Sequence, residues 1–306
     1  MTVYQTVKKV RRLSPFRGGL SADRAAWLFM APAFFFYGAF VLLPMAMSAY
    51  YSLLSWDGIG QARFVGLANY LTVVTDDDLL HIIANAFRLV LYFTVIPVLL
   101  GLTVASVIRN QMSGRFGTVT RTVLFIPQVI PLIAAGIVWS WMYDSSGVVN
   151  QFLILIGLED WTRGWLGDFD FALPAVGLIG SWVLLGLCML LLVTGISRID
   201  PSLYEAARID GANPWHEFRH ITLPGLRQEI GVCVTVTIIQ ALSSFDIVYV
   251  ATSGGPGIET MVPGLEIYRL AFAHRQVGLA SALGVVLMLL VLFVVIPVQW
   301  LTRDKQ

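Results

Sequence analysis

The sequence predicts an all-α membrane protein, a polytopic bundle of six transmembrane helices with a short helical loop outside the membrane between the fourth and fifth. Hydrophobic residues make up 57% of the 306 residues and charged residues 13%, whereas soluble domains have roughly 45–50% and 25%. The excess apolar surface therefore requires lipid. Apolar runs of about 20 residues, the length that crosses a bilayer, lie near residues 26–53, 85–108, 121–143, 172–197, 229–251 and 277–301.

The first apolar run is longer than one crossing requires, and it could consist of two pieces around Pro44. A basic stretch precedes it, as in a secretory signal peptide, but the run continues well past the roughly 7–15 residues of a signal-peptide core. We therefore expect a retained signal-anchor helix. The second and third runs contain Pro97, Pro127 and Pro131, which are candidate kinks.

Basic residues mark one side of the predicted bundle. They precede the first run, follow the second, separate the fourth from the fifth and end the chain, and they are Lys8, Lys9, Arg11, Arg12, Arg17, Arg24, Arg109, Arg115, Arg121, Arg198, Arg208, Arg219, Arg227, Arg303 and Lys305. The loops on the other side hold more acidic than basic residues. The positive-inside rule therefore puts both termini in the cytoplasm. The predicted organisation is a basic cytoplasmic segment at 1–24, a transmembrane domain at 25–301 and a cytoplasmic tail at 302–306.

The loop at 198–228 is polar and predicts two short helices. Asp200–Pro201 is a helix start, because a capping side chain precedes a proline at a position that needs no amide partner. Gly211 ends this first helix, and Asn213–Pro214 repeats the start signal for a second helix through Ile221. Pro224 then opposes continuation into the next span.

The surface of the first loop helix favours a protein partner. Glu205 places a charge in the early turns, where the helix dipole favours an anion, and Ala206 and Ala207 add almost no bulk. The alternative is an amphipathic connector on the bilayer surface, but such helices have a large apolar face and many lysines. In the two loop helices, Arg208 and Arg219 are balanced by Asp210 and Glu217. We therefore expect the helix to enter a narrow cleft on another protein.

This loop resembles the cytoplasmic loop of binding-protein-dependent ABC importer permeases, in which the coupling helix docks into a groove on the ATP-binding subunit. The matching positions are Glu205, Ala206, Ala207, Gly211, Ile221, Leu223 and Pro224. Further stretches are similar to the maltose-type sugar permeases, namely FVGLANY at 64–70, RTVLFIPQVIP at 121–131, FDIVYVATSGGPG at 245–257, IYRLAF at 267–272 and GLASALGVVL at 278–287. The resemblance covers most of residues 25–300.

The resemblance implies a permease subunit in a prokaryotic inner membrane that moves a carbohydrate delivered by an extracytoplasmic binding protein. A second homologous permease, completing a heterodimer, and two copies of a nucleotide-binding ATPase subunit are the implied partners. ATP and Mg would be bound by those ATPase subunits, and no cofactor by this chain. The sequence contains no G-x-x-x-x-G-K-[ST] loop, so we do not expect it to be an enzyme. The net charge of +1 gives no indication of nucleic acid.

Polar residues inside the fourth and fifth runs are candidates for the substrate path, because polar groups in spans are costly and often line a cavity. They are Trp182, Thr237, Gln240, Ser243, Ser244, Asp246 and Tyr249. Trp182 could stack on the apolar face of a sugar ring. The alternative is structural, since hydroxyl and amide side chains also join helices and tryptophans mark membrane interfaces. Small residues in the sixth run, Gly278, Ala280, Ala282 and Gly284, predict close helix packing.

Two other functions remain alternatives. His216, Glu217 and His220 match H-E-x-x-H, which on a helix presents two imidazoles to zinc with the glutamate as general base. Against a zinc metalloprotease, the pattern lies outside the predicted spans and no third ligand follows it. A secondary transporter would more often show paired repeats or ionisable residues at mid-membrane. Cys188 and Cys233 fall inside predicted spans and indicate neither a disulfide nor a metal site.

Overall fold

The computed structural model describes residues 22–111 and 115–302, which belong to two compact units, Met1–Met47 and Ser48–Gln306. Most of the predicted N-terminal segment at 1–24 and of the tail at 302–306 lies outside the described residues. The same holds for seven of the basic residues on which the orientation depends, namely Lys8, Lys9, Arg11, Arg12, Arg17, Arg303 and Lys305.

The first unit is built from one apolar helix. It comprises α1 (Ala22–Tyr37), a π-helical turn (Gly38–Leu42) and α2 (Leu43–Tyr51), whose last residues belong to the second unit. Residues Phe29–Tyr51 form a candidate membrane span. The helix continues through Pro44, so the run is not divided there. The wider π turn just before Pro44 explains this, because a proline ring clashes with the carbonyl four residues earlier in a regular α-helix.

The second unit is helical apart from one small hairpin, in which β1 (Leu54–Ser55) pairs antiparallel with β2 (Arg63–Phe64). Its α-helices are α3 (Ala68–Thr75), α4 (Asp77–Val90), α5 (Ile96–Gln111), α6 (Arg115–Val129), α7 (Leu132–Met142), α8 (Val148–Leu155), α9 (Ala172–Ile196), α10 (Pro201–Ile209), α11 (Pro214–Glu217), α12 (Leu223–Gly225), α13 (Arg227–Leu242), α14 (Asp246–Ala251), α15 (Pro263–Tyr268) and α16 (Val277–Thr302). Short turns of π-helix lie at Leu91–Val95, Phe218–Thr222 and Arg269–Ala273, and a 3-10 turn lies at Glu159–Trp161.

The prediction of six transmembrane helices is confirmed in part, because the third run is bent and the fifth is interrupted. The described residues contain four helices long and apolar enough to cross a bilayer, Phe29–Tyr51, Asp77–Val107, Ala172–Ile196 and Val277–Thr302, or five if the bent pair α6 and α7 is one span. That pair bends by 100° at Pro131, which supplies no amide and disfavours the helical conformation of the residue before it. The helix of the fifth run stops at Leu242 and resumes at Asp246, and Phe245 between them is outside the helical conformation (φ −141°, ψ −58°).

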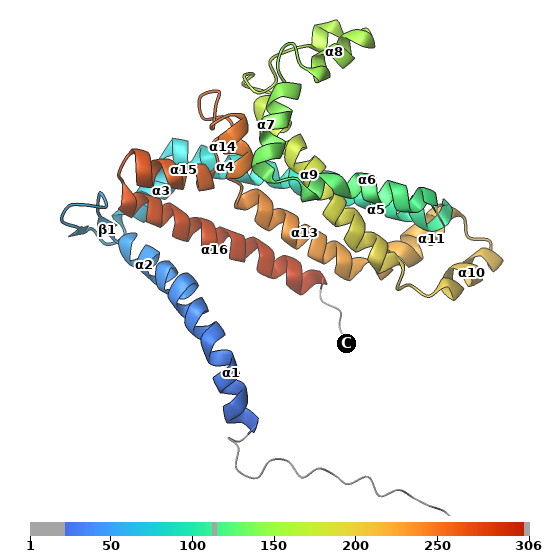
Figure 1. The fold of residues 1–306 in the computed structure, drawn as a ribbon, viewed down its shortest axis with the longest axis horizontal. Coiled ribbons are helices and arrows are strands. Elements are labelled where there is room, and N and C mark those ends of the chain that lie inside the picture. Colours follow the sequence, from blue (N-terminus) through green and yellow to red (C-terminus); the bar gives the residue numbers. More distant parts are fainter. Residues whose placement is uncertain (1–21, 112–114, 303–306) are drawn as a thin grey trace, which may run out of the picture. The chain divides into compact units, whose positions relative to one another are not determined.

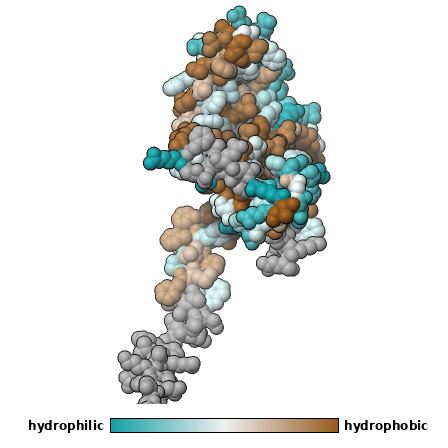
Figure 2. Space-filling model, turned by 90° about the vertical axis from the view of Figure 1, so that its right-hand side faces the viewer, coloured by the Kyte–Doolittle hydropathy of each residue, from teal (hydrophilic) through white to brown (hydrophobic). Residues whose placement is uncertain are grey.

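The long helices of the second unit lie side by side around α9 (Figure 1). Helices α5, α6 and α13 all contact α9, and α13 also contacts α16. The polar loop with α10 and α11 lies at one end of this bundle, and α3, α15 and the hairpin lie at the other. Much of α9 is buried, including Ile179, Met189 and Leu192. Hydrophobic patches lie among polar ones on the face shown in Figure 2, and many large apolar side chains are exposed on the helices, as expected of a protein surrounded by lipid.

The small residues of α16 differ in how closely they pack, with Gly278 in tight contact and Gly284 in open contact. A Cβ atom at Gly278 would collide with the carbonyl oxygen of Leu54, whereas the nearest atom to a Cβ at Gly284 is Ile267 Cδ1 at 3.8 Å. We expect Gly278→Ala to destabilise the protein by about 1–3 kcal/mol, because backbone must move to admit the methyl group. Gly284→Ala is the matched control and should change little. Thermal unfolding of the two purified variants in detergent measures the difference; equal melting temperatures would contradict the close packing.

Candidate functional site

The polar loop at 198–228 begins with the two predicted helix starts. The side chain of Asp200 accepts a hydrogen bond from the backbone N–H of Ser202 (2.9 Å), and that bond lowers the pKa of the Asp200 carboxyl. Asn213 Oδ1 accepts from the N–H of His216 in the same way (2.9 Å). Both capping predictions are confirmed. The second helix differs from the prediction, since a π-helical turn carries it past Ile221 and Pro224 lies inside α12 rather than ending the helix.

Gly211 ends α10 in the left-handed region, with φ at +82°. The N–H of Ala212 donates to the carbonyl of Ala207 (2.9 Å), which closes the last turn of the helix. No heavy atom lies within 4 Å of a Cβ placed on Gly211. The position therefore requires glycine for its backbone conformation and not for space.

An ion pair joins the two halves of the loop. Arg208 on α10 donates from Nε to Oε1 of Glu217 at 2.8 Å, and Glu217 is buried while the Arg208 side chain is 59% exposed. The hydrogen bond and the charge of Glu217 raise the pKa of the Arg208 guanidinium. The hydroxyls of Tyr204 and Thr222, 3.1 Å apart, form a second link. Helices α10, α11 and α12 are therefore one structural element.

The outward surface of this element mixes small, acidic and large apolar groups. Glu205 and Ala206 are exposed, as predicted. Leu203 and Ile209 are exposed as well, Ile209 by 86%, and the sequence analysis did not single them out. The signal was the presence of two large aliphatic side chains on the short first helix of the loop, whose other residues are mostly small or polar. Apolar anchors of this kind are what a groove on a partner protein buries.

The H-E-x-x-H pattern does not form a metal site. Glu217 is held by Arg208, and the imidazoles of His216 and His220 stack with ring centroids 5.9 Å apart. Nδ1 of His216 lies 2.8 Å from Asn213 Oδ1. Among the residues that the structure describes, no group of three or more His, Cys, Asp or Glu side chains is arranged to hold a metal ion. The pattern is accounted for by helix capping and by the ion pair.

A second candidate site is a cavity of about 130 Å³ where the two helix breaks meet. The break between α6 and α7 and the break between α13 and α14 both contribute to its wall, together with α9. Four of the predicted substrate-path residues line it, namely Gln240, Ser243, Ser244 and Asp246. The other lining residues are Phe93, Gln128, Ile130, Leu132, Gly180, Val183, Leu184, Phe245 and Ile247. Interrupted helices with polar side chains between them are a common way to build a solute site within a membrane.

Gln128 is the residue of this cavity that the sequence analysis missed. Its Oε1 atom is buried and accepts no hydrogen bond from a described residue. A buried acceptor without a partner is costly, and a functional role is one explanation for its presence in a native protein. The signal was present in the sequence, since Gln128 lies between Pro127 and Pro131 in an otherwise apolar run, where the backbone was expected to kink.

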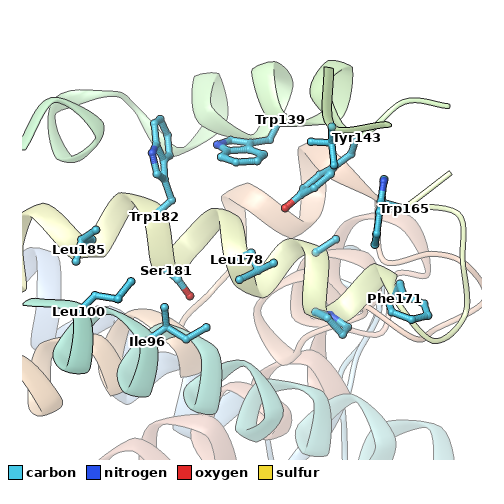
Figure 3. Close-up of a pocket in the computed structure, with 13 residues that line it drawn as sticks. Ile96, Leu100, Trp139, Tyr143, Trp165, Phe171, Leu178, Ser181, Trp182 and Leu185 are labelled. Carbon is cyan, nitrogen blue, oxygen red and sulfur yellow. The ribbon is translucent and has the colours of Figure 1, made fainter. Parts of the chain in front are cut away.

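The remaining predicted residues lie elsewhere. Thr237 is buried and its hydroxyl donates to Thr94 Oγ1 (3.0 Å), so it joins two helices. Tyr249 is exposed and packs its ring against those of Phe245 and Tyr268. Trp182 does not line the polar cavity and instead lines a separate aromatic groove (Figure 3).

The aromatic groove has a volume of about 650 Å³ and lies on the other side of α9. Trp182 meets the edge of Trp139 there, with ring centroids 5.5 Å apart, and Tyr143 and Trp165 extend the aromatic wall toward the loop before α9 (Figure 3). The groove is almost entirely apolar, which suits a hydrocarbon or another apolar helix better than a hydroxylated solute.

One helix connects the two candidate sites. Helix α13 begins at Arg227, directly after the polar loop, and ends at Leu242, at the break that opens into the cavity. It packs against α9 and α16.

Comparisons with known proteins agree on one family. The family model for the binding-protein-dependent transport system inner membrane component matches residues 97–305. The chain is 34% identical over 272 residues to a probable ABC transporter permease protein of Pyrococcus horikoshii. The aligned residues are 88% of this chain and 92% of that protein. The chain is also 32% identical over 288 residues to the diacetylchitobiose uptake system permease protein NgcF of Streptomyces coelicolor, covering 89% and 81%.

A solved structure shares the fold. It is a chain of a bacterial alginate ABC transporter in complex with an alginate pentasaccharide-bound periplasmic protein, with a TM-score of 0.77, 24% identity, and coverage of 92% of this chain and 94% of that one. The chain therefore belongs to the binding-protein-dependent transport system inner membrane components, the multi-pass permease subunits of ABC importers.

Proposed function

We propose that this permease imports a carbohydrate and that α10 is its coupling helix, with ATP hydrolysed on separate subunits. The observation that carries the coupling role is the element α10 to α12, which presents Glu205, Ala206 and Ile209 outward while an ion pair holds it together from within. The motif positions Ile221, Leu223 and Pro224 lie in its second half. A preformed, rigid element loses little entropy on docking into a groove.

The charge distribution supports an orientation with both termini in the cytoplasm. The polar loop is then cytoplasmic, where ATP is, and the acidic loops at the opposite end of the bundle receive the binding protein. In this arrangement residues 1–24 and 302–306 are cytoplasmic segments that flank a transmembrane domain at 25–301. The chain crosses the membrane six times, with the third and fifth crossings made by the interrupted pairs α6 with α7 and α13 with α14.

A carbohydrate suits the cavity at the helix breaks. Its polar groups are two amides, two hydroxyls and one carboxylate, and it contains no arginine or lysine. Such groups bind hydroxyl groups well, whereas a phosphate ester would favour a cation. The relatives that transport diacetylchitobiose and alginate point to the same class of substrate. A second permease completes the path, because this cavity is small and forms one side of a passage.

In the proposed cycle, closure of two ATPase subunits moves α10 together with α11 and α12. Helix α13 transmits the movement to the break at Ser243–Phe245. The chain can bend there because the helix is interrupted between α13 and α14. The cavity then changes between outward-open and inward-open forms. Gln128 and Gln240 bind the solute in one form and release it in the other.

Association with an ATPase tests the proposal. We expect the tagged chain, purified from native membranes in mild detergent, to bring down an ATP-binding subunit and measurable ATP hydrolysis. Ile209→Glu should remove both, because a charge replaces an apolar anchor of the docking surface. Leu155→Glu on α8 is the matched control, since Leu155 is exposed to a similar extent (82%) but lies far from the loop. Retention of the ATPase by Ile209→Glu would contradict the docking role of α10.

A further inference from the structure

A second polar cavity lies beside the coupling helix, with a volume of about 390 Å³. It is lined by residues of α5, the middle of α6, the end of α9 and α10. It shares no lining residue with the cavity at the helix breaks, and the proposed transport cycle does not use it.

The walls of this cavity differ in polarity. One wall is apolar and contains Ala105, Val193 and Ile196, which are buried and lie at the ends of the candidate spans Asp77–Val107 and Ala172–Ile196. The lining also includes two arginines, Arg121 on α6 and Arg208 on α10. The apolar wall is therefore at the depth where the hydrocarbon of the bilayer ends, and the arginines are at the depth of the lipid headgroups.

Both arginines have free donors. Arg121 is exposed and makes no hydrogen bond or ion pair with any described residue, although α6 directs it to the cavity. Arg208 uses Nε for Glu217, which leaves its two terminal amino groups available. A guanidinium binds phosphate oxygens through parallel N–H groups. Glu205 is the one acidic residue on the rim, so the cations outnumber the anions there.

We propose that this cavity binds an anionic phospholipid, with the headgroup phosphate between Arg121 and Arg208 and an acyl chain along the apolar wall. A basic pocket between membrane helices at the interface is a typical site for such lipids. The apolar wall favours a lipid over a soluble phosphate compound, because a soluble ligand would leave that wall exposed to water. The bound lipid would join α6 to α10, and its effect on transport rests on the proposed coupling role of α10.

Lipid binding can be measured on the chain alone, so that the result is independent of the ATPase. We suggest native mass spectrometry of the detergent-purified chain, titrated with phosphatidylglycerol or with phosphatidylcholine of the same acyl chains at about 0.15 M salt. We expect phosphatidylglycerol to bind more tightly. Arg121→Gln should weaken its binding about five- to tenfold, and Arg121→Lys should keep most of the affinity.

Arg115→Gln is the matched control, because Arg115 is an exposed arginine on the same helix that does not line the cavity. Its affinity for phosphatidylglycerol should equal that of the wild type. Equal binding of the two lipids, an unchanged Arg121→Gln variant, or the same loss in Arg115→Gln would overturn the proposal. Millimolar inorganic phosphate should not displace the lipid; displacement would assign the arginines to a soluble phosphate ligand and would also overturn it.

Discussion

Gly211→Val is expected to abolish ATP-driven uptake and to release the ATPase from the permease. Gly211 has φ at +82°, which a β-branched residue adopts only at a large cost. Left-handed backbone costs about 1–2 kcal/mol for an ordinary L-residue and more for valine. No heavy atom lies within 4 Å of a Cβ atom at this position, so the cost comes from the backbone conformation and not from a clash at Cβ. The turn between α10 and α11 would open, and the Arg208–Glu217 pair would lose its geometry.

Gly211→Asn is the matched control for this experiment. Asparagine adds a larger polar side chain at the same exposed position but adopts the left-handed region far more readily than valine. We expect Gly211→Asn to keep most of the uptake and to retain the ATPase during purification. If both variants were inactive, the side chain itself would obstruct the docking surface. If both were active, the geometry of the turn would have no part in coupling.

The structure of the polar loop at 198–228 could be predicted closely because it depends on local signals. Asp200 and Asn213 cap helices through bonds to residues two or three positions away, and Gly211 permits a backbone conformation that few other residues adopt. Such signals can be identified in the sequence without knowing the rest of the fold. The ion pair between Arg208 and Glu217 could not be predicted in the same way, since it depends on the angle between α10 and α11.

The interruptions of the third and fifth runs were harder to predict. Hydropathy measures the cost of placing a segment in lipid, and an interrupted helix has the same composition as a continuous one. Pro131 was identified as a candidate kink, but a proline can also be accommodated, as Pro44 and Pro97 are in continuous helices. The break after Leu242 has no proline at all and depends on contacts with neighbouring helices.

The residues that line the polar cavity at the helix breaks were predicted in part, and the omissions and wrong inclusions have a common cause. Position within a span indicates depth but not direction around the helix axis. Trp182 and Leu184 are two residues apart on α9, yet Trp182 lines the aromatic groove and Leu184 the polar cavity. Gln128 was missed because it comes from a different run than the other polar residues, and only the fold brings the two breaks together.

Replacing both glutamines of the cavity, Gln128→Leu with Gln240→Leu, is expected to lower uptake by about 10- to 100-fold. Each amide that loses a hydrogen bond to a substrate hydroxyl weakens binding by about 0.5–1.5 kcal/mol, and more where the lost partner leaves a buried group unpaired. Leucine has a similar size, so the shape of the cavity should persist. Basal ATP hydrolysis by the purified complex should stay near the wild-type rate, because the coupling loop is unchanged.

Gln299→Leu controls for the loss of an amide from a membrane helix, since Gln299 lies on α16 and does not line this cavity. Its uptake should match that of the wild type. An equal loss of uptake in this control would show that the effect is general. A loss of basal ATP hydrolysis in the double variant would show that the two glutamines affect the coupling machinery.

The single variant Gln128→Leu separates a binding role from a structural one. Oε1 of Gln128 is buried and accepts no hydrogen bond from the described residues, so removing it should leave the melting temperature unchanged or raise it. A residue that joined helices would show the opposite, a lower melting temperature. We expect lower uptake together with unchanged or greater stability, because an acceptor that stabilises nothing in the empty protein gains its partner only when the substrate is bound. A lower melting temperature, or normal uptake, would remove Gln128 from the substrate path.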